Sequence, residues 1–184
     1  MSLISCKNCG KQISDLATCC PHCGTDFNVK EKAYSTKFFK TICNALTEAN
    51  INFNVNEEEG SVMLHGMRLD ANIKRATFMA IARTEDIIIF GTYEDFSIPN
   101  ESLPVVNKLL HRINFDHIYP YLNIDYDYKN VACRFAFEFE ESTINNGDFI
   151  DALVCVNDHL QKYANAILAT SLGFQTPEEA LASC

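Results

Sequence analysis

Apolar residues recur at helical spacing in three stretches of the chain beyond its first 33 residues. These stretches cover residues 34–49, 99–113 and roughly 148–171. A repeat near 3.6 residues places the apolar side chains on one side of a helix, so each stretch predicts a helix that packs on a core. Gly173 is placed to end the third helix. A short final helix is predicted after Thr176, because a capping threonine is followed there by proline and two acidic residues.

Between the predicted helices, apolar and polar residues alternate, which is the pattern of half-buried strands. The clearest alternation begins at Val131, and the acidic turn at residues 57–60 is expected to join the first two strands in a β-hairpin. The run Ile87-Ile88-Ile89-Phe90 is apolar on both faces. It fits a central strand covered on both sides, or a strand that faces a partner subunit. The predicted strands cover residues 51–56, 62–66, 76–83, 87–93, 118–126 and 131–140.

The order of these elements is helix, four strands, helix, two strands and a long helix. Short links between successive strands favour antiparallel pairing, so the sequence predicts an α+β fold with an antiparallel sheet flanked by helices. We expect this domain to span residues 34–184. Residues 1–30 form a separate small domain in this interpretation, and the charged segment 28–33 links the two.

Paired cysteines dominate the small N-terminal domain. Two residues separate the cysteines of each pair, ten residues separate the pairs, and a glycine follows each pair directly. This spacing lets two tight turns bring four thiolates to one metal ion, and zinc accepts four thiolates tetrahedrally without redox chemistry. Four protein ligands leave no position for water, so we expect one structural zinc ion rather than a catalytic one. The predicted ligands are Cys6, Cys9, Cys20 and Cys23.

This segment resembles the zinc-ribbon family over roughly residues 4–27. The family's CPxCG knuckles appear here as Cys6-Lys-Asn-Cys9-Gly10 and Cys20-Pro-His-Cys23-Gly24, and the first lacks the proline. Cys19 is an alternative ligand, but its spacing to Cys23 breaks the tight turn, so Cys20 is preferred. A redox role for the CxxC pairs is a weaker alternative, and His22 is expected to point outward.

The remainder of the chain, from about residue 36 to 182, resembles the YbjN family, whose fold is like that of type III secretion chaperones. The resemblance implies an antiparallel sheet flanked by helices, a chaperone-like or regulatory role, frequent homodimers and no catalytic residues to carry over. The resemblance depends on the pattern of hydrophobic residues and of residues that begin or end elements in 46–53, 109–114, 133–135 and 172–180.

Charge argues against general nucleic-acid binding. The 184-residue chain has a net charge of −9, and residues 1–33 carry four lysines against three acidic residues, which leaves −10 for the remainder. So acidic a body repels phosphate backbones. The chain has no secretory signal and no apolar run long enough to span a bilayer, so we expect a cytoplasmic protein without a membrane anchor.

Candidate catalytic groups each have a simpler structural interpretation. Cys43, Cys133 and Cys155 lie in or beside apolar periodic faces, as buried small hydrophobic residues do. The histidines fall singly in different elements, and no GxGxxG, GxxxxGK[ST] or GxSxG motif is present. A solvated acidic edge is the expected role of the carboxylates around the last hairpin. The single histidines are His65, His111, His117 and His159, and the acidic residues are Asp125, Asp127, Glu138, Glu140 and Glu141.

Together these features predict a non-enzymatic, zinc-binding protein-interaction module that acts as a chaperone-like protein or a regulatory adaptor. Its expected partner is a protein of unknown identity, and a homodimer is a further possibility. The alternative is a nucleic-acid-associated zinc-ribbon regulator, with a basic face formed by Lys7, Lys11, Lys30 and Lys32.

Overall fold

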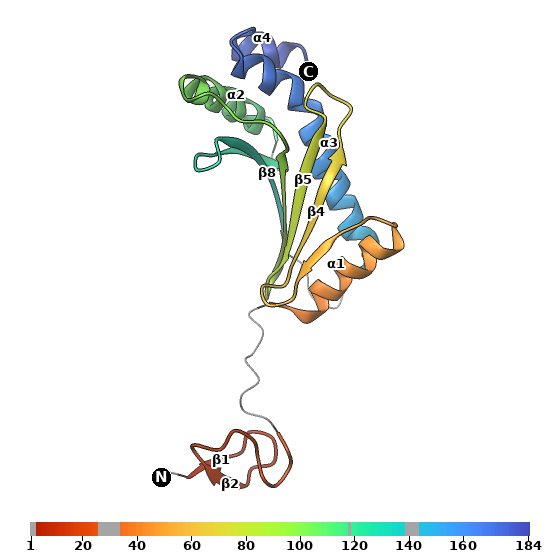
Figure 1. Cartoon of the computed structure of the whole chain (residues 1–184), viewed down its shortest axis with the longest axis vertical. Coiled ribbons are helices and arrows are strands. Elements are labelled where there is room, and N and C mark those ends of the chain that lie inside the picture. The colour runs from red at the N-terminus through yellow and green to blue at the C-terminus, as the bar shows by residue number, and fades with distance from the viewer. Residues whose placement is uncertain (1–2, 26–33, 118, 139–143) are drawn as a thin grey trace. The chain divides into compact units, whose positions relative to one another are not determined.

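The structure is a computed structural model that describes residues 3–25, 34–117, 119–138 and 144–184. The chain divides into two compact units, Met1–Lys32 and Ala33–Cys184 (Figure 1). The predicted link at residues 28–33 lies outside the described residues. In the first unit, strands β1 (Leu3–Ser5) and β2 (Gln12–Ser14) form a short antiparallel pair, which the sequence patterns did not indicate.

The second unit is built on a six-stranded antiparallel sheet with the order β3-β4-β5-β6-β8-β7. Strands β4, β5 and β6 each pair with the strand before them in the sequence, β8 joins β6, and β7 forms the far edge. The sequence therefore predicted the antiparallel sheet and the first hairpin correctly. The strands are β3 (Asn54–Asn56), β4 (Ser61–Arg68), β5 (Arg75–Ala82), β6 (Asp86–Tyr93), β7 (Tyr121–Asp125) and β8 (Asn130–Glu138).

Four α-helices accompany this sheet in the predicted order. Asn145 caps the longest helix through a capping box with Asp148, and Thr176 caps the last helix in the same way with Glu179. Gly173, with φ of +73°, follows the longest helix as its sequence position predicted. The helices are α1 (Thr36–Glu48), α2 (Leu103–Phe115), preceded by a 3-10 turn at Asn100–Ser102, α3 (Asn146–Ser171) and α4 (Pro177–Ala182).

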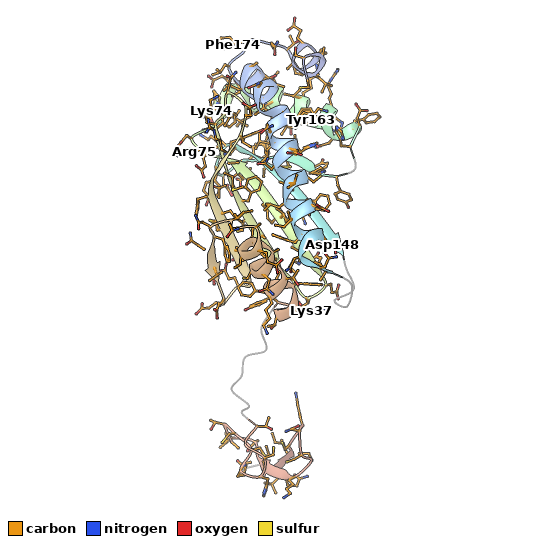
Figure 2. All side chains as sticks on the ribbon, turned by 90° about the vertical axis from the view of Figure 1, so that its right-hand side faces the viewer. Lys37, Lys74, Arg75, Asp148, Tyr163 and Phe174 are labelled. Atoms are coloured by element: carbon orange, nitrogen blue, oxygen red, sulfur yellow. The ribbon has the colours of Figure 1, made fainter. Side chains whose placement is uncertain are left out.

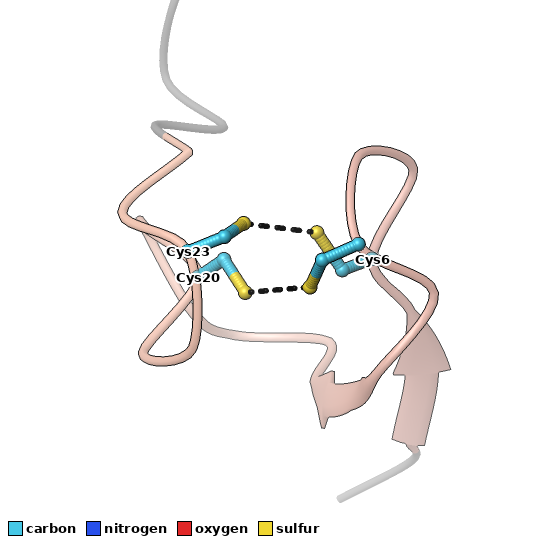
Figure 3. Close-up of side chains that lie close together, drawn as sticks. Cys6, Cys20 and Cys23 are labelled. Atoms are coloured by element: carbon cyan, nitrogen blue, oxygen red, sulfur yellow. Dashed lines mark hydrogen bonds between the residues drawn. The ribbon is translucent and has the colours of Figure 1, made fainter.

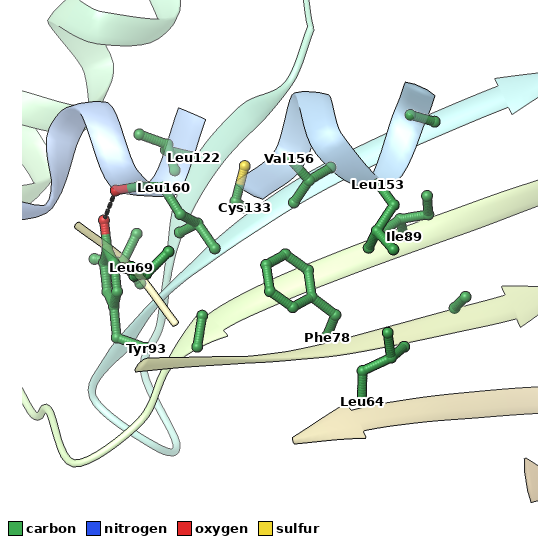
Figure 4. Packing of buried hydrophobic residues seen from close by; sticks show 14 of the residues in the cluster. Leu64, Leu69, Phe78, Ile89, Tyr93, Leu122, Cys133, Leu153, Val156 and Leu160 are labelled. Atoms are coloured by element: carbon green, nitrogen blue, oxygen red, sulfur yellow. Dashed lines mark hydrogen bonds between the residues drawn. The ribbon is translucent and has the colours of Figure 1, made fainter. Parts of the chain in front are cut away.

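The core lies between one face of the sheet and the helices. Helices α1 and α3 lie along the same side of the strands (Figures 1 and 2). Side chains from four strands meet α3 there, and all of them are nearly inaccessible to solvent. Figure 4 shows Leu64, Phe78, Ile89 and Cys133 of the sheet beneath Leu153, Val156 and Leu160 of α3. Burial of this apolar surface is the main favourable term in the folding of the unit.

Two predicted strands differ from the structure. The strand expected at residues 51–56 is reduced to the three residues of β3, because Ile51 and Phe53 pack against the core outside the ladder. The predicted strand at 131–140 is described only to Glu138, so its last two residues fall outside the described part. Strand β6 is central, as predicted from its apolar run.

The second face of the sheet, which we call the open face, points away from α1 and α3. Its residues alternate with the core residues along each strand, and most are half-buried although they are largely apolar. No helix covers this face within the part of the chain that the structure describes. Coverage on both sides, one of the two predictions for Ile87–Phe90, is therefore not found there. The open face comprises Met63, Thr77, Met79, Ile81, Ile88, Phe90, Thr92, Tyr121, Ala132, Arg134 and Ala136.

None of the helices that the structure describes is long and apolar enough to cross a membrane.

Candidate metal centre

Two backbone turns of the same design carry the paired cysteines of the first unit. In the first turn the amide of Gly10 donates to the carbonyl of Cys6 at 2.8 Å, and in the second the amide of Gly24 donates to that of Cys20 at 2.8 Å. Both glycines have positive φ, +72° and +73°. An L side chain is strained in this conformation, so the glycine after each pair is required by the turn itself.

The two turns bring the four predicted thiols together. Figure 3 shows Cys6, Cys20 and Cys23 around a common centre, and the Sγ atoms of all four cysteines lie within 4.8 Å of one another. The Sγ–Sγ distance is 3.8 Å between Cys6 and Cys23, and 3.7 Å between Cys9 and Cys20. Tetrahedral zinc with bonds of about 2.3 Å requires sulfur atoms about 3.8 Å apart. The unit therefore has a single potential zinc site with suitable dimensions.

Burial differs between the two cysteines of each pair. Cys6 and Cys20 are 2% and 1% exposed and form a small cluster with Ile13, whereas Cys9 and Cys23 are exposed. These three side chains are the only buried apolar cluster among the described residues of the unit. Metal binding must therefore supply most of the free energy that holds it together.

Hydrogen bonds favour the thiolate form of two ligands. The hydroxyl and then the backbone N–H of Thr25 lower the pKa of Cys23 to about 6. The backbone N–H groups of Cys9 and Asn8 lower the pKa of Cys6. The backbone N–H of Lys11 also lowers the pKa of Cys9, but burial and the adjacent thiols raise it to about 11. Cys23 is therefore largely a thiolate at neutral pH, whereas Cys9 must release its proton when a metal ion binds.

Two residues that sequence reasoning missed support the site. The side-chain amide of Asn8 donates to Thr25 Oγ1 at 2.9 Å and lies 3.8 Å from Cys23 Sγ. Thr25 Oγ1 in turn lies 3.1 Å from that sulfur. Asn8 belongs to the first turn and Thr25 follows the second, so this contact joins the two turns. Its only sequence signal is a polar residue beside each cysteine pair, which is too common to be diagnostic.

The remaining cysteines are placed apart from this centre. Cys19 is exposed and is not part of the four-thiol group. Cys133 is buried in the core, as predicted, and burial raises the pKa of its thiol. Cys43 is half-buried against the core, but Cys155 is exposed on α3. The prediction of a buried Cys155 is wrong, because that position lies at the margin of the apolar side of the helix.

Two histidines that are far apart in the sequence lie together in the second unit. The rings of His117 and His159 are 5.2 Å apart in an edge-to-face arrangement, and His117 Nε2 lies 2.9 Å from the hydroxyl of Tyr163. The two histidines belong to different elements, as the sequence indicated, and they meet because the end of α2 packs against α3. His65 and His111 are exposed, and Glu140 and Glu141 lie outside the described residues.

Comparisons with known proteins agree with this geometry. The family model of a zinc-ribbon domain matches residues 2–27, which include both cysteine pairs. No curated protein sequence matches the chain. Among solved structures, the chain is similar to one in the crystal structure of the ExsC–ExsE complex, with 13% sequence identity and a TM-score of 0.49. The alignment covers 69% of this chain and 92% of the other, but at this score the likeness supports no conclusion about the second unit.

Proposed function

We propose that the protein is a non-enzymatic, zinc-binding protein-interaction module that acts as a chaperone-like protein or regulatory adaptor. Cys6, Cys9, Cys20 and Cys23 hold one structural zinc ion in this proposal. Support comes from their close approach and from the zinc-ribbon match over residues 2–27. Because the four thiolates complete the coordination of zinc, no position is left for a reacting water.

The observation that carries the interaction role is the open face of the sheet. Met79 and Phe90 lie near its centre and are half-buried, as is the neighbouring Ile81, whereas Ile88 is buried. A contiguous apolar surface of this kind on a folded domain marks a binding site for another macromolecule. We propose a protein as that partner, in the cytoplasm, and include a second copy of the chain among the partners.

Nucleic acid is a weaker partner for this molecule. Lys7 and Lys11 are exposed on the first unit, while Lys30 and Lys32 lie outside the described residues. The net charge of −10 on residues 34–184 repels phosphate. A filter-binding assay with single-stranded and duplex oligonucleotides at low salt is expected to show no binding. Salt-sensitive binding there would replace the protein-interaction proposal.

Zinc content tests the metal part of the proposal. The full chain, purified under reducing conditions, is expected to hold about one zinc ion per chain in elemental analysis. Cys20→Ser should lose this zinc, because only three thiolates remain and the lost ligand is one of the two buried ones. Cys19→Ser is the matched control and should retain it. Metal-free wild-type protein, or equal loss in the two variants, would contradict the proposed ligand set.

Affinity capture tests the interaction part. Tagged full chain expressed in its native cells is expected to retain a specific protein, whereas a Met79→Lys variant should retain less, because a charge is placed at the centre of the open face. Phe174→Lys, at an exposed position outside that face, is the control. Equal recovery by both variants would remove the open face from the proposal.

A further inference from the structure

The open face is hollowed at the end where it meets the hairpin of β7 and β8. This hollow has a volume of about 390 Å³ and is lined by residues of β4, β5 and β6 and of that hairpin. Most of its wall is apolar or aromatic and comes from Met63, Met79, Phe90 and Tyr128. Asp125 is the one charged residue among the described residues that line it, so we call it the Asp125 hollow.

The carboxylate of Asp125 is held in place by its own turn. Its Oδ1 accepts from the backbone N–H groups of Asp127 and Tyr128 at 3.0 and 3.1 Å. Within the described part of the chain, Oδ2 accepts no hydrogen bond and no basic side chain forms an ion pair with this carboxylate. Asp125 is nevertheless half-buried. The turn therefore fixes a carboxylate whose charge is unpaired and whose second oxygen can accept from a ligand.

The other charged groups around the hollow offset one another. Glu94 accepts from the hydroxyl of Thr77 at 2.6 Å and pairs with Arg75 at 3.5 Å. Asp127 and Lys129 share the turn and carry opposite charges, and neither of them lines the hollow. The charge that remains uncompensated at the hollow is therefore the negative charge of its own carboxylate.

The basic side chain of the open face is engaged elsewhere. The guanidinium of Arg134 lies 5.7 Å from the centre of the Phe90 ring. It lines a separate hollow of about 340 Å³ together with Tyr119 and Tyr121. The contact shows that an aromatic ring of this face packs with a guanidinium, as expected from the attraction between a cation and the face of a ring.

The wall and the carboxylate together suit a long basic side chain. Arginine and lysine lay their apolar stems along apolar surface and keep the charged end at a polar group. Met63 and Met79 offer such a surface, Phe90 and the 79% exposed Tyr128 offer ring faces, and Asp125 offers the acceptor. An apolar side chain would cover the carboxylate without pairing it, which is costly, and an acidic one would be repelled.

The edges of the sheet are poorly suited to bind a partner by an added strand. Strand β3 has only three residues. At the other edge, Asn114 Oδ1 accepts from the backbone N–H of Leu122 at 2.9 Å, and Asn114 Nδ2 donates to the backbone carbonyl of Leu122 at 2.7 Å. These two backbone groups in the middle of β7 are thus already paired. Recognition of side chains on the open face is therefore favoured over strand addition.

We infer that the Asp125 hollow binds a basic side chain, arginine or lysine, of the protein partner. The inference rests on the proposed interaction role and specifies the chemistry of the partner at that same face. The net charge of −10 on residues 34–184 attracts a basic partner over a longer range. A second copy of the chain carries the same negative charge, so the charge favours a different protein.

Nuclear magnetic resonance of the full chain with isotope-labelled methionine methyl groups tests this inference. Nα-acetyl-arginine amide should shift the signals of Met63 and Met79 saturably, whereas Met67, which packs against the core, is the internal reference. Nα-acetyl-citrulline amide has the same shape without the charge and should bind at least about fivefold more weakly, because a charged hydrogen bond is lost. Equal binding of the two amides, or no shift with either, would overturn the inference.

Two variants of one turn locate the charge. Asp125→Asn keeps an oxygen that can accept from the turn but removes the charge, and it should weaken the arginine amide at least about fivefold. Asp127→Asn removes the same charge from the same turn outside the hollow, and it should bind as the wild-type protein does. Equal affinities of the two variants would overturn the inference. Methionine shifts that follow protein concentration without any amide would assign the hollow to a second copy, with the same consequence.

Affinity capture separates this inference from the proposed function. Tagged Asp127→Asn should retain the partner protein of the wild-type chain, and tagged Asp125→Asn should retain less of it. A partner retained equally by both variants would overturn the inference and leave the proposed function intact. A wild-type chain that captures no protein would contradict the proposed function instead, while the amide titration still decides what the hollow binds.

Discussion

His159 shows how a single residue can set the acid sensitivity of this molecule. It is 8% exposed on α3, and its Nε2 has no hydrogen-bond partner among the described residues. Burial, and to a smaller extent the neighbouring His117 and Lys162, lower the pKa of His159 to about 4. The folded state therefore keeps this imidazole neutral at neutral pH.

Stability is expected to fall with pH because of this residue. The pKa of an ordinary histidine is 6.5. Between pH 6.5 and about 4, this histidine is therefore protonated in the unfolded chain and neutral in the folded chain. The free energy of unfolding should decrease by about 1–2 kcal/mol between pH 7 and pH 5 on this account. His159→Phe keeps an aromatic ring and should reduce that decrease.

Urea unfolding at the two pH values, followed by tyrosine fluorescence, measures the difference. All seven tyrosines lie beyond residue 33 and the chain has no tryptophan, so the signal reports on the second unit alone. His111→Phe, at an exposed position, controls for the loss of a histidine. A His159→Phe variant that loses as much stability as the wild-type protein would exclude this role.

At the scale of elements, the contact between α3 and β6 depends on a residue without a side chain. A Cβ atom added to Gly91 would lie 2.6 Å from Leu160 Cδ1 and 2.9 Å from Phe78 Cε1. Real Cβ atoms do not approach other atoms so closely. Gly91 is therefore the point that allows the long helix to lie directly on the central strand.

Gly91→Ala should destabilise the second unit by about 1–3 kcal/mol, because the added methyl group overpacks this contact. Thr92→Ala, the next residue and one that points to the open face, is the control and should cost less. Urea denaturation midpoints compare the two. An alanine at position 91 that leaves the midpoint unchanged would show that α3 can move away from the sheet without cost.

The start of α3 offers a second prediction at this scale. Asn145 Oδ1 accepts from the backbone N–H of Asp148 at 3.1 Å, and Asp148 Oδ2 accepts from the backbone N–H of Asn145 at 3.0 Å. Asn145→Ala should cost about 1 kcal/mol, whereas Asn145→Ser, which keeps a capping oxygen, should cost much less. Thermal unfolding separates the two variants. Equal melting temperatures would mean that packing alone fixes this helix end.

Sequence patterns predicted the elements well where the cause is local. The periods of apolar residues, the cap at Thr176 and the CxxCG turns all act within a few residues, and each is found in the structure. What they did not predict depends on contacts between distant segments. His117 meets His159 only because α2 packs on α3. The bare side of the sheet is another such case, since alternation defines two faces without telling which of them a helix covers.

At the scale of the whole molecule, the two units are stabilised in different ways. The second unit has an extensive apolar core between sheet and helices. The described part of the first unit buries little beyond two cysteines and Ile13, so its shape depends on metal–sulfur bonds. Units stabilised so differently are expected to unfold independently.

Removal of zinc with a strong chelator should therefore affect only the first unit. Four additional thiols are expected to react with a thiol reagent after chelation, since four cysteines form the site. The melting temperature of the second unit, read from tyrosine fluorescence, should not change. Apo protein in which the tyrosine transition disappears would show that the two units share a core. The same measurement on Cys20→Ser separates loss of the metal from side effects of the chelator.

The side chain of Asn114 has a consequence for how large an assembly can become. Asn114 Oδ1 accepts from the backbone N–H of Leu122 and Asn114 Nδ2 donates to its backbone carbonyl, so these two groups in the middle of β7 are not free to pair with another chain. The addition of strands to a free sheet edge is a route to fibres, and Asn114 hinders such addition at the β7 edge. Replacing Asn114 by leucine would leave both backbone groups of Leu122 without these hydrogen bonds and should make the chain more prone to aggregate through this edge.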